Sequence, residues 1–204
     1  MKTLNNYINE ALIKKDTNIS IYKYCPKDKD ELKSLIEKLL KERGKNADLN
    51  DIDVSNIEDM SYLFSELNPY NIDISEWNVS KVKNMHSMFI NRDKFNSDLS
   101  KWDVSNVEDT ALTFFGCEKF NSNLTQWNVS KVKDMNRMFE GCHNFNSDLS
   151  NWDVSNVKDM YHMFWMCDKF NYDLSKWNVK SVKDTTNIFY KCTSLKNKPS
   201  WYKK

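Results

Sequence analysis

Four cysteines recur at intervals of 25 residues, a pattern that could supply disulfides or a zinc site: Cys117, Cys142, Cys167 and Cys192. In stacked repeats they would lie about 5 Å apart, the spacing of neighbouring strands. An evenly spaced ladder singles out no pair, and the sequence has neither a C-x-x-C motif nor a matching column of histidines. We therefore interpret the column as a buried, small apolar position, with disulfides and zinc as the alternatives. Cys25 lies outside the pattern and is expected to be a free thiol.

Two columns of Asp and Asn could bind calcium or form hydrogen-bonded turns. One precedes a repeated Leu, and the other follows a repeated Trp. The first holds Asp48, Asp73, Asp98, Asn123, Asp148 and Asp173, and the second Asn78, Asp103, Asn128, Asp153 and Asn178. Stacked carboxylates would repel one another, and the interposed Asn residues halve that charge. Because the sequence has no glycine-turn calcium motif, we expect solvated, hydrogen-bonded turns, with calcium as the alternative. The prediction is no metal and no cofactor.

Catalytic chemistry finds little support in the sequence. His86, His143 and His162 stand in three different columns, and nothing aligns one of them with a Ser or Cys nucleophile. Only 3 glycines occur, which excludes a glycine-rich phosphate-binding loop. The chain is therefore predicted not to be an enzyme, and no catalytic residue is assigned.

A 25-residue repeat positions all of these residues. Its marker is a Trp that recurs without insertion or deletion, at Trp77, Trp102, Trp127, Trp152 and Trp177. A fixed period of this kind indicates a repeat architecture, in which stacked units bury the faces that one unit leaves open. Counting the Val or Ile two residues after the Trp position gives about six units between residues 45 and 194.

Each unit is predicted to contain a short strand and a short helix. Residues 99–107 fit the leucine-rich-repeat template as L-x-x-W-x-V-x-x-V. In the strand, Trp102 and Val104 would point inward, with Lys101 and Asp103 outward. Apolar residues spaced by three and four then predict one or two turns of α- or 3₁₀-helix. The predicted fold class is α/β, a right-handed leucine-rich-repeat-like solenoid.

Residues 1–44 are predicted to form an N-terminal helix–strand–helix cap. The helices are expected over 3–15 and 28–43, with a strand over 18–24 between them. In the second helix, Asp28 and Glu31 have capping-box spacing, and Gly44 suits the left-handed position after it.

The solenoid is predicted over residues 45–204, with a C-terminal cap from about 195. Pro199 falls where the repeated Leu should be, and Pro cannot donate to a ladder of hydrogen bonds. Trp201 and Tyr202 are expected to fold over the last layer of the core.

Composition limits the class of partner. Of the 204 residues, 40% are hydrophobic, and 30 Lys and Arg oppose 29 Asp and Glu. Without a basic excess, no nucleic-acid partner is expected. No stretch approaches the roughly 20 apolar residues that span a bilayer. The N-terminus lacks the features of a signal peptide, so the expected location is cytoplasmic.

The repeat resembles the BspA-like leucine-rich-repeat family, in its bacterial surface-protein branch. The resemblance covers residues 45–195 and rests on W-[DN]-V-S-[NK]-V, a Met-Phe pair such as Met138–Phe139, and F-N-x-[DN]-L-[ST]. It implies a right-handed solenoid that serves as a binding protein or adhesin rather than an enzyme. A surface location follows only from this resemblance.

The outward strand positions are the predicted contact surface for a protein partner. They are Glu76, Asn78, Lys101, Asp103, Gln126, Asn128, Asn151, Asp153, Lys176 and Asn178. Repeat proteins use such extended surfaces for recognition. Aromatic residues on the other side, Tyr161, Trp165, Tyr172 and Tyr190, are an alternative interface. The predicted function is a non-enzymatic protein-interaction scaffold. The alternatives are a self-associating structural component, for example of a phage or mobile element, or a surface adhesin.

Overall fold

The computed structural model describes residues 22–67 and 71–202, and within them it contains one helix and no continuous strand. The helix, α2, spans Lys29–Arg43. Asp28 caps its start by accepting a hydrogen bond from the Glu31 N–H at 2.9 Å, and Gly44 follows its end with a φ of 84°. The helix predicted over residues 28–43 is thus confirmed, together with the residues that delimit it.

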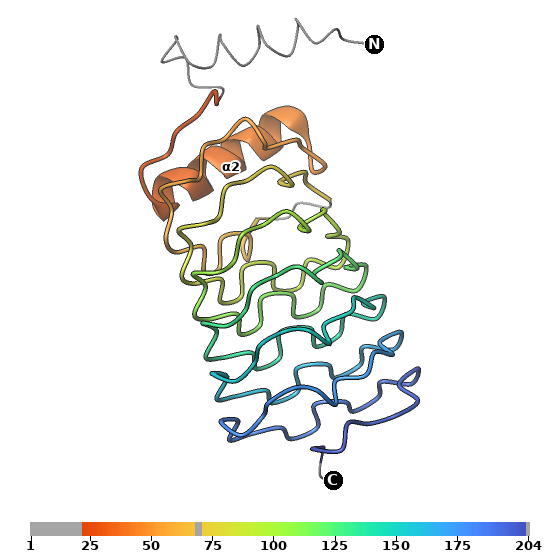
Figure 1. Cartoon of the computed structure of the whole chain (residues 1–204). Coiled ribbons are helices and arrows are strands. Elements are labelled where there is room, and N and C mark those ends of the chain that lie inside the picture. The colour runs from red at the N-terminus through yellow and green to blue at the C-terminus, as the bar shows by residue number, and fades with distance from the viewer. Residues whose placement is uncertain (1–21, 68–70, 203–204) are drawn as a thin grey trace, which may run out of the picture.

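The helix α2 lies across the N-terminal end of the repeats (Figure 1). Its apolar stripe of Leu32, Ile36 and Leu39 is fully buried. At its first turn, Lys29 Nζ lies 2.6 Å from Asp59 Oδ2 in the repeats. The helix therefore closes this end of the array both by apolar burial and by an ion pair.

The other elements predicted within residues 1–44 fall largely outside the described residues. These are the helix over 3–15 and most of the strand over 18–24. Tyr24 is described, and it forms an isolated parallel bridge with Ile52. The Asp53 N–H donates to the Tyr24 carbonyl at 2.8 Å, which attaches this segment to the first repeat.

Successive 25-residue units lie side by side as layers (Figure 1). Isolated parallel bridges join equivalent residues of consecutive layers, in the series Asp59–Asn84, Asn84–Asp109, Asp109–Asp134, Asp134–Asp159 and Asp159–Asp184. Alternate N–H groups near each bridge donate to the next layer. Between residues 85–91 and 109–115, for example, four such bonds have lengths of 2.7 to 2.9 Å.

The short strand predicted around Trp102 and Val104 is wrong, although both side chains point inward, with exposures of 4% and 2%. The Trp102 N–H donates to the Leu99 carbonyl of its own layer at 3.1 Å, and the Val107 N–H donates to Val104 at 2.9 Å. These turns use N–H groups that a strand would offer to its neighbour.

The short helix predicted in each unit is also wrong. Leu112 and Gly116 have φ values of 56° and 69°, and a helix of either kind requires consecutive right-handed residues. Left-handed residues recur at equivalent places in other layers: Tyr62, Ser87, Arg137, His162 and Asn187 at the first place, and Asn91, Gly141, Met166 and Lys191 at the second.

The predicted α/β leucine-rich-repeat-like solenoid is therefore incorrect for this chain. Only α2 is a helix among the described residues, and the layers meet through isolated bridges rather than through a regular sheet. The cross-layer backbone ladder runs where the helix was predicted, and local turns occupy the place of the predicted strand.

Stacked aromatic rings fill the core between layers. Phe114 lies parallel to Phe89 at 5.6 Å and to Phe139 at 5.7 Å between ring centroids. All three side chains are fully buried. Each such burial contributes about 2 kcal/mol, and it is complete only when a layer lies on both sides.

The C-terminal segment continues one of these columns. Trp201 stacks on Trp177 with ring centroids 6.3 Å apart and 3° between the planes. Tyr202 packs against Phe189 edge-on at 5.5 Å. The prediction that Trp201 and Tyr202 fold over the last core layer is confirmed.

Candidate interaction surface

The Asp and Asn columns form turns in which a side-chain oxygen accepts a backbone N–H two residues later. Asp98 accepts from Ser100 at 2.9 Å, and Asp103 accepts from Ser105 at 3.0 Å. Hydrogen bonds from these serines hold the pKa values of both carboxyl groups below their ordinary range. The predicted hydrogen-bonded turns are confirmed. Within residues 22–67 and 71–202, no three His, Cys, Asp or Glu side chains are grouped to hold a metal ion.

The ten residues of the predicted contact surface are all exposed. Five of them are the Asn and Asp after the Trp, and each accepts such an N–H bond: Asn78, Asp103, Asn128, Asp153 and Asn178. Of the other five, the structure brings Glu76 and Lys101 together at 2.5 Å, whereas Gln126, Asn151 and Lys176 lie exposed in later layers. Half of the predicted surface thus has a structural role in turns.

A neighbouring column of charges was missed by the sequence prediction. It follows the second repeated Val or Ile, is exposed in every layer, and is named here the charged column: Glu58, Lys83, Glu108, Lys133, Lys158 and Lys183. Its signs alternate over four layers and then stop alternating. The end of the alternation can be predicted from the sequence, because the repeats align without gaps and each layer contributes one residue to the column.

The alternating part of the charged column neutralises itself. Lys83 Nζ lies 2.7 Å from Glu58 Oε2, and Lys133 Nζ lies 2.5 Å from Glu108 Oε2. The hydrogen bond from Lys133 lowers the pKa of Glu108, so this carboxylate stays charged at neutral pH. Each pair is exposed and contributes little to stability, but it cancels charge on this face.

Beyond Lys133 the charged column is entirely positive. Lys158 follows Lys133, and Lys183 follows Lys158, so neither has an acidic residue at the equivalent place in the preceding layer. No ion pair joins Lys158 or Lys183 to any residue that the structure describes. Neighbouring layers are about 5 Å apart, so their like charges repel.

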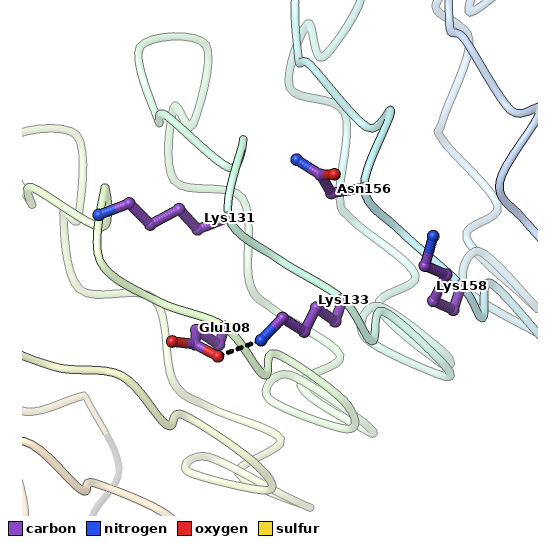
Figure 2. Close-up of a pocket in the computed structure, with 5 residues that line it drawn as sticks. All are labelled: Glu108, Lys131, Lys133, Asn156 and Lys158. Carbon is purple, nitrogen blue, oxygen red and sulfur yellow. Dashed lines mark hydrogen bonds and ion pairs between the residues drawn. The ribbon is translucent and has the colours of Figure 1, made fainter.

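A hollow of about 370 Å³ lies on this face, and Glu108, Lys131, Lys133, Asn156 and Lys158 line it. Figure 2 shows Lys133 directed toward Glu108, with Lys158 on the following layer. Lys131 Nζ is itself held by the Asn106 side chain at 2.6 Å. Three lysines and one carboxylate thus line the hollow, and Lys133 is the lysine that contacts the carboxylate.

Three members of the cysteine column are fully buried, as interpreted from the sequence, and Cys192 is half-buried. Each thiol donates to a backbone carbonyl 28 residues earlier at 2.9 to 3.0 Å, in the pairs Cys117–Phe89, Cys142–Phe114, Cys167–Phe139 and Cys192–Phe164. Burial raises the pKa of Cys142 and Cys167 well above the ordinary value, and that of Cys192 to about 12. All four thiols are free, as is the exposed Cys25.

The three histidines lie apart, each beside a carboxylate of an adjacent layer. His143 Nδ1 lies 2.7 Å from Asp168 Oδ2, and His86 Nδ1 lies 3.5 Å from Asp109 Oδ2. His162 is different because it is buried. It packs against Tyr161 and Trp165, with centroids 3.7 and 3.8 Å away.

The buried His162 faces Glu140, with 3.4 Å between Nδ1 and Oε2. Neither atom forms a hydrogen bond with a described residue. Burial lowers the pKa of His162 and raises that of Glu140, so both shifts favour the neutral forms. Arg137 lies 3.5 Å from the Glu140 carboxylate and opposes the shift of that group.

Among the four aromatic residues named as an alternative interface, Tyr190 is exposed, at 46%, and the others are half-buried. Trp165 packs against the Tyr190 ring at 4.6 Å. Tyr161, Trp165 and Tyr190 are thus linked through His162 into a row of contacting rings, of which Tyr190 is the most exposed.

A family model described as "Mycoplasma protein of unknown function, DUF285" matches residues 32–128 and again residues 101–202. Together the two matches extend from the first turn of α2 to residue 202. No curated protein and no solved structure matches the chain. No helix in the described parts of the chain has both the length and the apolar character needed to cross a membrane.

Proposed function

As the chain belongs to the DUF285 family of Mycoplasma proteins, whose function is unknown, we propose from its surface that it is a non-enzymatic protein-binding module. In this proposal an acidic partner protein binds the face that carries Lys131, Lys133, Lys158 and Lys183. The partner's carboxylates lie where the alternation of the charged column would have placed glutamates.

The observation that carries the proposal is the break in charge alternation at Lys158. The earlier layers pair each lysine of the charged column with a glutamate, so the repeat is able to neutralise this face. It does so only in part of the array. Unpaired, stacked lysines repel one another, and an acidic partner would relieve that repulsion on binding. Complementary charge also accelerates encounter and selects the partner.

The resemblance to BspA-like surface proteins supports the same role. The motifs that carry it, W-[DN]-V-S-[NK]-V and the Met-Phe pair, supply buried core residues and turns. They maintain an array whose outer residues are free to vary. A binding role uses that variation, whereas the described residues do not form the leucine-rich-repeat backbone that the resemblance implies.

Lys158→Glu tests the proposal sharply because it completes the alternation. The charged column would then place a glutamate between Lys133 and Lys183, so we expect the melting temperature to hold or rise. Proteins retained from the native source by the immobilised wild-type chain would be lost from the variant. Lys119→Glu, an equal change of charge outside the column, is the matched control.

Retention that is equal in the wild-type chain, Lys158→Glu and Lys119→Glu would overturn the proposal. A loss of retention that is the same in both variants would also contradict it, since net charge rather than this face would then be responsible.

A further inference from the structure

The last layer presents a row of backbone donors that no described residue accepts. In the layer before it, alternate N–H groups donate to the last layer at 2.9 to 3.1 Å, in the pairs Met160–Asp184, His162–Thr186, Phe164–Ile188 and Met166–Tyr190. The equivalent groups of the last layer are the N–H groups of Thr185, Asn187, Phe189 and Lys191. None of these four donates to another residue within the described part of the chain.

The apolar side chains beside this row are incompletely covered. Val182 and Cys192 are half-buried, whereas their counterparts one layer earlier, Val157 and Cys167, are fully buried. Trp201 covers the other half of the layer, where it stacks on Trp177. The C-terminal segment therefore closes the Trp-bearing half of this end and also covers the Phe189 ring, whereas Val182 and Cys192, at the two ends of the donor row, stay partly exposed.

Lysines outnumber acidic residues in and near this C-terminal edge, which is defined here as residues 182–192. Residues 176–202 contain six lysines and one acidic residue, Asp184. All six lysines are exposed: Lys176, Lys180, Lys183, Lys191, Lys196 and Lys198. The surface thus combines unpaired N–H donors, a partly exposed apolar strip and a positive field.

We propose that the C-terminal edge binds an extended acidic peptide segment of a partner, which adds to the array as one more layer. Its alternate carbonyls would accept the four N–H groups, and its carboxylates would face the lysines. Because all the bridges in the array are parallel, the segment is expected to run parallel to residues 184–191. This edge is a surface distinct from the hollow at Lys158.

Charge and donor geometry argue against a second copy of the chain as the occupant. Two C-terminal edges placed face to face would oppose donors with donors and lysines with lysines. The N-terminal end of another copy is covered by α2 (Figure 1). An acidic segment that supplies carbonyls fits this edge better than either end of the same protein.

The chain itself provides a suitable probe. Residues 108–116, EDTALTFFG, carry two acidic residues and no basic one. In the array their carbonyls accept the donor row of the layer before them. A labelled synthetic peptide of this sequence can be added to the full-length chain, with KKTALTFFG as the matched control peptide. Binding is followed by fluorescence anisotropy, and backbone protection by hydrogen exchange resolved to single amides.

We expect the acidic peptide to bind at least tenfold more tightly than the lysine peptide. The amides of Thr185, Asn187, Phe189 and Lys191 should exchange rapidly in the free protein and slowly in the complex. Lys191→Glu should weaken binding at least fivefold, while Lys119→Glu leaves it unchanged. Lys158→Glu should leave the protection of residues 185–191 intact. Peptide binding at the C-terminal edge can therefore be distinguished from partner binding at the face that carries Lys158.

Three results would overturn the proposal. The first is that the acidic and lysine peptides bind equally, or that neither binds. The second is slow exchange of the four amides in the free monomer. The third is a dimer in sedimentation whose formation protects these amides, which would assign the edge to a second copy.

Discussion

The indole Nε1–H of Trp127 donates to the carbonyl oxygen of Leu99, 28 residues earlier, at 2.9 Å. The other tryptophans of the column make the same bond to the preceding layer, from Trp77 to Trp177. In the half of the layer where turns consume the backbone N–H groups, this side chain provides a cross-layer hydrogen bond. Each Trp thus joins neighbouring layers by a hydrogen bond and also fills the core.

Trp127→Phe should lower the free energy of unfolding by about 2–4 kcal/mol. The change leaves the buried Leu99 carbonyl without its donor and opens a cavity beside the ring. Trp201→Phe, at the half-buried end of the column, should cost less. Urea unfolding measures both, and an equal cost for the two variants would contradict the assigned role.

Gly116→Ala should destabilise the fold by about 1–3 kcal/mol, because the residue is left-handed, with a φ of 69°. A Cβ there would also lie 2.6 Å from the Asn91 side-chain oxygen. The reciprocal change, Lys191→Gly, places glycine at an exposed left-handed position and should be neutral or stabilising. Thermal unfolding of both variants tests the assignment, and a destabilised Lys191→Gly variant would count against it.

Stability should decrease as the pH falls through the ordinary pKa of histidine, near 6.5. Burial lowers the pKa of His162, so below that pH the unfolded chain binds this proton more readily than the folded one. Glu140, whose pKa is raised, acts in the opposite direction, and its contribution is lost as the pH rises through its folded value. That window extends upward from the ordinary pKa of glutamate, whereas the window for His162 extends downward from about 6.5.

His162→Asn should flatten the dependence of unfolding free energy on pH between about 7.5 and 5.5. Asparagine also tolerates the left-handed φ of 57° at this position. His143→Asn, which removes a half-exposed histidine, is the control. A slope that is unchanged in His162→Asn would exclude His162 as the group responsible.

One thiol should react at once with a thiol reagent in the native protein, and three should react only as the protein unfolds. Cys25 is exposed, whereas Cys117, Cys142 and Cys167 are fully buried. Cys192, half-buried in the last layer, should react at an intermediate rate. Rapid labelling of Cys142 would show that the layers separate readily. The variant Cys25→Ser identifies the fast thiol.

The sequence predicted which residues face the core far better than it predicted the backbone. Trp102 and Val104 were correctly assigned to the interior because stacking requires apolar columns. The strand and helix assignments failed because turns and left-handed residues control the backbone. Leu112 has a positive φ, and nothing about Leu signals this; only Gly116 and Gly141 hint at such a conformation.

The surface was predicted in part. The exposure of Asp103 and Asp153 was correctly anticipated, but their carboxylates also form turns. The charged column was missed because it lies outside the predicted strand, whose outward residues were taken as the contact surface. Comparison of Glu108 with Lys158 across aligned units would have revealed it, since only position within the repeat is needed.

The closure of one end by α2 has a mechanical consequence. Each layer bonds to its immediate neighbours. The whole of α2 lies across the first layer, whereas Trp201 and Tyr202 cover only part of the C-terminal layer. Opening should begin at the C-terminal layer and proceed one period at a time toward residue 45. A molecule bound at the C-terminal edge would have to dissociate before the last layer could open. Its binding would therefore determine how easily the array unfolds from that end.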